Sequence, residues 1–157
     1  MGYTHYFDYE PTDPRFQRAW PQMVSDTRKI VARVHGAGIV LRNPFGAGPP
    51  VVSVEAAIAF NGDETQDLSC EPLVLVPREV PPYRQYGFCK TGRFPYDVAV
   101  MAVLLRCHLL APDAFTFHSD GRWDEDWQGP WYNGLSGRGV VAELFGSTPT
   151  ASPFDNE

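Results

Sequence analysis

Apolar positions spaced three and four residues apart mark a helical segment in the first third of the chain. Asp13 followed by Pro14 is a typical helix start. Pro21 interrupts the pattern, and a proline inside a helix costs ~3 kcal/mol. The sequence therefore predicts a helix over 21–34, with 14–20 as either a preceding turn or a kinked first segment. The apolar positions are Phe16, Trp20, Met23, Ile30, Val31 and Val34.

A second helix is predicted from Pro95 to Leu110, a segment that is apolar around nearly its whole circumference. A helix of that kind is buried on all sides, here between a sheet and the first helix. Its longest apolar run, Val98 to Leu105, is far shorter than the ~20 residues that a membrane span needs, so we expect no membrane contact. A short third helix is predicted at 139–145.

Runs rich in β-branched and aromatic residues predict the strands. Asn61-Gly62, a strong turn dipeptide, ends one of them, so 73–76 is expected to pair antiparallel with 51–60. The segment 77–85, which contains three prolines, and the segment 123–137 are predicted to be irregular. The predicted strands are 3–7, 39–41, 51–60, 73–76, 86–89 and 115–118.

Strands and helices do not alternate along the chain, which favours an α+β fold over a doubly wound one. We predict a single domain with a largely antiparallel sheet packed against two main helices, about 21–34 and 95–110. A length of 157 residues fits one domain. The domain is drawn from 1 to 146, and the polar segment 147–157 is expected to be a mobile tail.

Composition narrows the classes of protein. Apolar residues make up 43% and charged residues 20%, as in soluble globular proteins. The net charge of −6 disfavours duplex nucleic acid as a partner, because that binding is driven by phosphate neutralisation. Three cysteines without a CxxC pair indicate neither a disulfide framework nor a zinc ribbon. With no secretory signal apparent, we expect a cytoplasmic protein; the sequence indicates no cofactor and leaves the oligomeric state open.

Candidate chemistry begins in the stretch Phe88–Asp97, which joins a predicted strand to the second helix. With Pro95 at a first helical position, the amides of the first turn lack intrahelical partners. These amides and the helix dipole favour an anion, and Lys90 and Arg93 are close in sequence. Either an anionic ligand occupies this helix start, or Asp97 caps the helix and pairs with Arg93 or Lys90.

Histidine and cysteine give further candidates. His5 and His118 lie on predicted strands beside polar residues, so either is a candidate acid or base, oriented by Asp97 or Asp120. No histidine pair has metal-binding spacing, so no metal site is predicted. Cys89 is either a reactive thiol beside a cation or, more simply, a buried structural cysteine.

Three tryptophans, at 123, 127 and 131, lie in a segment that also contains several acids. The acids do not have the spacing of an EF-hand calcium loop. Tryptophans at this density serve to stack on a planar ligand, to anchor a protein interface, or to pack a loop-rich corner. The sequence leaves these three roles open.

Several short motifs together resemble a family of small bacterial and phage proteins that has no established activity. They are MGYTHY at Met1–Tyr6, Phe60-Asn61-Gly62, CKTxRxPYD at Cys89–Asp97, and Ser119-Asp120-Gly121 followed by Trp123. The chain departs from the family pattern at Phe7 and at Cys70-Glu71, where Trp and a His-Glu pair are usual. The resemblance implies relatedness, and the host cytosol if the protein is phage-encoded. Because such polar residues are costly to bury alone, we expect three of these motifs, the N-terminal one, the one at the start of the second helix and the Ser119 turn, to converge on one polar pocket.

The first functional hypothesis is a binding protein for a small anionic, nucleotide-like molecule, which in a phage would sequester a host immune signal. A second is an enzyme acting on a similar substrate by His/Asp acid–base chemistry. A third is a protein–protein inhibitor that uses the Trp-rich 123–132 surface. The expected ligand-binding residues are Tyr3, Thr4, His5, Lys90, Thr91, Arg93, Tyr96, Asp97, Ser119, Asp120 and Trp123.

Overall fold

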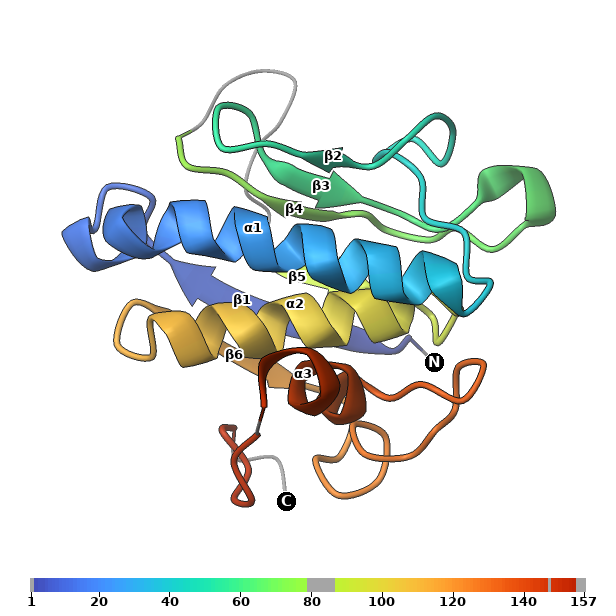
Figure 1. Ribbon diagram of the computed structural model, residues 1–157. Helices are drawn as coiled ribbons and strands as arrows, with labels where there is room; N and C mark the ends of the chain where they lie inside the picture. Colours follow the sequence, from blue (N-terminus) through green and yellow to red (C-terminus); the bar gives the residue numbers. More distant parts are fainter. Residues whose placement is uncertain (1, 79–86, 147, 155–157) are drawn as a thin grey trace.

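The computed structural model of the protein describes residues 2–78, 87–146 and 148–154 (Figure 1). Within them, three α-helices and two three-stranded antiparallel sheets confirm the predicted α+β class. The elements in chain order are β1 (Thr4–Tyr9), α1 (Pro14–Gly36), β2 (Val51–Val52), β3 (Ile58–Phe60), the 3-10 turn η1 (Glu64–Gln66), β4 (Leu73–Leu75), β5 (Phe88–Lys90), α2 (Asp97–Leu110), β6 (Phe115–Ser119) and α3 (Gly137–Phe145).

The strand order is β5-β1-β6 in the first sheet and β2-β3-β4 in the second sheet. The two sheets meet edge to edge, since the Glu71 amide donates to the Lys90 carbonyl at 3.0 Å. The Tyr9 hydroxyl joins them again by accepting from the Val76 amide at 2.8 Å. Figure 1 shows α1 and α2 side by side across one face of the strands, with α3 beside α2. The main core lies between these helices and the strands.

Helix α1 runs without a break from Pro14, so 14–20 is helical and not a turn. The Asp13 carboxylate caps it by accepting from the Arg15 amide at 2.8 Å. Pro21 lies inside the helix, where it removes a hydrogen bond. Phe16 and Trp20 are buried, and fully burying an aromatic side chain stabilises by about 1.5–3 kcal/mol. The two rings together therefore offset the cost of the proline.

Helix α2 is the buried centre of the fold, as its apolar circumference predicts, and it contacts α1, α3 and β6. It begins at Asp97, two residues later than the predicted start at Pro95. Pro95 instead lies in a turn, in which the Asp97 amide donates to the Phe94 carbonyl at 2.8 Å. One of the amides expected to be free therefore has a backbone partner.

The predicted single strand 51–60 is wrong, because the chain folds back within it. The Ser53 amide donates to the Ala57 carbonyl at 2.9 Å, and β2 and β3 form a hairpin around that turn. The Ser53 hydroxyl also accepts from the Ala56 amide at 3.3 Å, a local bond that competes with an extended strand. The pairing of β4 with β3 confirms the predicted antiparallel partner.

The predictions for 39–41, 77–85 and 86–89 remain to be compared with the structure. Residues 39–41 form no strand: Ile39 and Leu41 are buried, but pairing is limited to an isolated bridge from Arg42 to Asn61. Most of the segment 77–85, like Tyr86 of the predicted strand 86–89, lies outside the described residues.

The core extends past the domain boundary drawn at residue 146. Phe154 is only 5% exposed and packs against the rings of Phe117, Trp123 and Trp127. The Trp123 indole also donates to the Thr150 carbonyl at 3.2 Å. The described part of the expected tail, 148–154, thus contributes to the core. Separately, none of the described helices has both the length and the apolar character that crossing a membrane requires.

Candidate functional site

The alternation of side chains along β1 divides the N-terminal motif between the two faces of the first sheet. His5, Phe7 and Tyr9 point toward the helices and are buried, and we call this the inner face. Thr4, Tyr6 and Asp8 point the other way, onto what we call the outer face. Residues adjacent in the motif therefore have opposite environments.

On the inner face, the three predicted motif segments converge on His5. Its Nδ1 lies 2.8 Å from Ser119 Oγ and its Nε2 lies 2.6 Å from Asp97 Oδ1. All three side chains are buried. Register explains the meeting, because His5 pairs across the sheet with Ser119 on one side and with Cys89 on the other.

The Asp97 side chain occupies the start of α2. Its Oδ1 also accepts from the Thr91 hydroxyl at 2.8 Å, and its Oδ2 accepts from the Tyr132 hydroxyl at 2.7 Å. These partners differ from the predicted ones, since neither Arg93 nor Lys90 bonds to it. The carboxylate faces the strands and not solvent, so the start of α2 is not an open anion site.

Tyr3 covers this network from the N-terminal side, with its ring 5.1 Å from the His5 ring. The Arg93 guanidinium lies 3.9 Å above the Tyr3 ring and bonds Asp126 at 2.6 Å. Burial raises the pKa of the Tyr3 hydroxyl, so that hydroxyl stays protonated. Gly121 allows the close packing, because a Cβ there would lie 2.1 Å from the Tyr3 hydroxyl oxygen.

Ser119, His5 and Asp97 are hydrogen-bonded in the same succession, Ser to His to Asp, as the triad of a serine hydrolase. The other hydrogen bonds of Ser119 nevertheless disfavour a role as nucleophile. Ser119 Oγ accepts hydrogen bonds from the Trp127 indole at 3.1 Å and from the Gly121 amide at 2.9 Å. Both lone pairs of the oxygen are thus engaged, and Ser119 is only 2% exposed. At this low exposure the Ser119 hydroxyl is shielded from a substrate in solution. The network instead ties β1, β6 and α2 together.

Of the two roles that the sequence left open for Cys89, a reactive thiol or a buried structural cysteine, the structure fits the second. It is buried, and its thiol contacts the Glu71 carbonyl at 3.4 Å. Burial, together with the nearby negative charges of Asp97 and Glu71, raises the pKa of this thiol. A raised pKa keeps the thiol protonated, whereas the thiolate is the reactive form.

The predicted ligand-binding residues therefore separate by exposure. Those that reach the surface are Thr4, Lys90, Arg93 and Asp120; those buried are Tyr3, His5, Thr91, Tyr96, Asp97, Ser119 and Trp123. Of the catalytic candidates, His5 and Asp97 lie on the inner face, whereas His118 and Asp120 are exposed. The Trp-rich surface is reduced to Trp131, which is 65% exposed, because Trp123 and Trp127 pack in the core.

The outer face carries a row of aromatic side chains that the sequence reasoning missed as a set. Phe88, Tyr6 and His118 are aligned across the three strands by the register of the sheet. Phe88 is 44% and Tyr6 37% exposed, and the Tyr6 and His118 rings stack at 4.8 Å. In the neighbouring row Lys90 pairs with Thr4. The alternation of side chains along a strand would have indicated that Thr4, Tyr6 and Asp8 share one face of the sheet.

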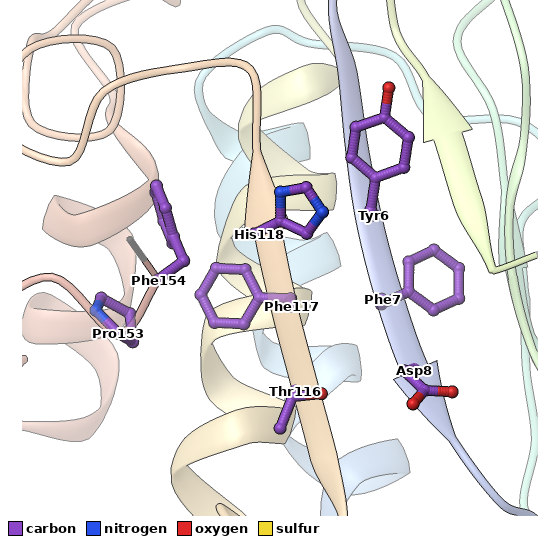
Figure 2. Close-up of a pocket in the computed structure, with 8 residues that line it drawn as sticks. All are labelled: Tyr6, Phe7, Asp8, Thr116, Phe117, His118, Pro153 and Phe154. Carbon is purple, nitrogen blue, oxygen red and sulfur yellow. The ribbon is translucent and has the colours of Figure 1, made fainter. Parts of the chain in front are cut away.

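A hollow of about 590 Å³ lies along β1 and β6 on this face. That volume falls within the range of small-molecule sites, about 300–1,000 Å³. Figure 2 shows Tyr6 and Asp8 on β1, Thr116 and His118 on β6, and Pro153 with Phe154 beyond the β6 edge. Elsewhere, no group of three His, Cys, Asp or Glu side chains in the described ranges is placed to hold a metal ion.

No protein-family model matches this chain, and no curated protein or solved structure is significantly similar to it. The resemblance to the bacterial and phage family consequently rests on the motifs alone.

Proposed function

We propose that this protein binds a small anionic, nucleotide-like molecule on the outer face of the first sheet. The observation that carries the proposal is the exposed row of Phe88, Tyr6 and His118 beside Lys90 and the hollow. Exposed aromatic rings on a sheet are a common platform for nucleobases, because every base has a flat face to stack. The inner face, with its partners already engaged, serves as the support for this platform.

Stacking and charge would act together on such a ligand. Base–aromatic stacking contributes about 1–3 kcal/mol per base, and the strand backbone holds the rings in place beforehand. Lys90 lies opposite Thr4, which is two residues from Tyr6 along β1. At about 3.3–3.4 Å per residue, the two rows are about 6.7 Å apart along the strand. The Lys90 ammonium group would donate to a phosphate in a charge-assisted hydrogen bond.

The charges around the platform favour a small ligand over a polymer. The Thr4 amide donates to Asp120 Oδ2 at 3.0 Å, which places an anion in the same row as Lys90. One cation flanked by an anion attracts a molecule with few charges, whereas a nucleic-acid strand requires several cations along its path. The net charge of −6 opposes a polyanion further.

The family resemblance extends the proposal to biology. If the chain is encoded by a phage, binding of a signalling nucleotide in the host cytosol would remove that signal from its receptor. A nucleotide bound without turnover suits this role, because the buried Ser119, His5 and Asp97 are enclosed by their own hydrogen bonds.

Isothermal titration calorimetry with a panel of mononucleotides and cyclic nucleotides tests the proposal. Tyr6→Thr keeps a strand-forming residue and removes the ring, and Lys90→Gln removes the charge. Loss of one stacking contact corresponds to roughly a 5- to 150-fold weaker affinity. Phe45→Ser is the matched control, since Phe45 is 72% exposed on a loop outside the first sheet. Binding that both Tyr6→Thr and Lys90→Gln leave unchanged, or a panel without any binder, would overturn the proposal.

A further inference from the structure

The row of Phe88, Tyr6 and His118 has opposite charges on its two sides along β1. Thr4, Tyr6 and Asp8 occupy successive outer-face positions, and Lys90 lies opposite Thr4. Asp8 is exposed and lies opposite Thr116, with which it lines the hollow. Among the described residues no cation forms an ion pair with Asp8. The aromatic row therefore lies between a cation on one side and an uncompensated carboxylate on the other.

This layout orients a nucleotide, an inference that rests on the proposed function. With the phosphate at Lys90 and the base stacked at Tyr6 and His118, the far edge of the base faces Asp8. The reverse orientation would bring the phosphate against the Asp8 carboxylate, and two negative charges in close contact repel each other. The base edge, and not the phosphate, is thus the part of the ligand that Asp8 meets.

We propose that Asp8 is a specificity-determining residue that selects guanine. A carboxylate only accepts hydrogen bonds and has two oxygens, so it pairs best with two neighbouring N–H donors. Guanine presents such a pair on one edge, its ring N–H and its exocyclic amino group. Adenine presents an amino group beside an unprotonated ring nitrogen, whose lone pair faces the carboxylate unfavourably. Hypoxanthine keeps the ring N–H of guanine and lacks the amino group.

Three mononucleotides separate these bases: GMP, IMP and AMP carry the same phosphate and sugar and differ in the edge that meets Asp8. By calorimetry we expect the wild-type protein to bind GMP at least tenfold more tightly than IMP, and AMP more weakly still. In Asp8→Asn the ratio of GMP to IMP affinity should fall to within about twofold, since an amide also donates and no longer carries charge. Asp67→Asn is the matched control, because Asp67 is an exposed acid beyond η1 and outside the hollow.

The outcomes distinguish this inference from the proposed function. Equal affinity for GMP and IMP in the wild-type protein, or a ratio that Asp8→Asn does not change, would overturn the role of Asp8 while leaving nucleotide binding in place. Failure of all three nucleotides to bind would overturn both. A preference for GMP that is lost in Asp8→Asn and kept in Asp67→Asn supports both.

Discussion

The inner and outer faces of the first sheet are made by the same three strands, yet they treat polar residues in opposite ways. On the inner face His5 and Asp97 are 0% exposed, and both bond to neighbouring side chains. On the outer face Tyr6, His118 and Lys90 are open to solvent. The side chains with the most reactive chemistry, His5 and Asp97, are thus engaged with each other. The surface left for a ligand is made of less conspicuous side chains.

The two faces should also differ in what a substitution does. A buried polar group that loses its partner bears the full cost of desolvation, whereas an exposed one finds water instead. Substitutions on the inner face should therefore reduce stability, and substitutions on the outer face should reduce binding.

Asp97→Ala should be the most damaging change, because it leaves His5, Thr91 and Tyr132 without their shared acceptor. A buried hydrogen-bonding group left without its partner typically costs about 1–3 kcal/mol, and three such groups are affected here. The outer-face counterpart Asp8→Ala should change the free energy of unfolding by less than about 0.5 kcal/mol. Urea denaturation of both variants measures the difference. Similar values for the two would contradict the division between the faces.

Gly121→Ala should have the next largest effect. The new Cβ would lie 2.1 Å from the Tyr3 hydroxyl oxygen, so the tightly packed ring must move. Overpacking of this kind costs about 1–3 kcal/mol. In the double variant Gly121→Ala with Tyr3→Phe the clashing oxygen is gone, so the combined loss should be smaller than the sum of the two single losses. A double-mutant cycle measures this coupling, and strict additivity would show that the hydroxyl is not what Gly121 accommodates.

Asp126, which pairs with Arg93, should give the smallest effect and a pH dependence. Partial burial acts to raise its pKa, but the hydrogen bond and charge of Arg93 and the Arg122 amide outweigh burial and lower the pKa below 3.8. A folded-state pKa below the unfolded value means that the stabilisation is present above that unfolded value. It is lost as the pH falls through the folded-state value.

Asp126→Asn should accordingly destabilise the protein by less than about 1 kcal/mol near neutral pH, since the pair is partly exposed to solvent. The difference from wild type should shrink as the pH falls below about 4, where the carboxyl of the unfolded chain is protonated first, and should be lost once the carboxyl of the folded protein is protonated as well. Thermal unfolding followed across that range tests this. A difference that stays constant down to the lowest pH would show that the charge of Asp126 does not contribute.

Local patterns predicted much of the fold and less of the site. The apolar circumference of 95–110 predicted the buried helix, and the turn at Asn61-Gly62 predicted the pairing of β3 and β4. The strand 51–60 was wrong because hydrogen bonds around Ser53 reverse the chain between two strand-like runs, Val51-Val52 and Ile58–Phe60. Helix α1 started earlier than predicted because the burial of Phe16 and Trp20 outweighs Pro21, and burial is not a local property.

The sequence by itself determined where the helices and most strands lie, because the spacing of apolar residues follows the period of each element. It also placed the motif residues on segments that come together. Only the tertiary structure decided which of them bond to one another, since His5 is 92 positions from Asp97 and 114 from Ser119. The side of the sheet on which each residue lies depends on strand alternation, and the covering of that side depends on where α2 packs. For that reason His5 became part of the core and Tyr6, the next residue, part of an open surface.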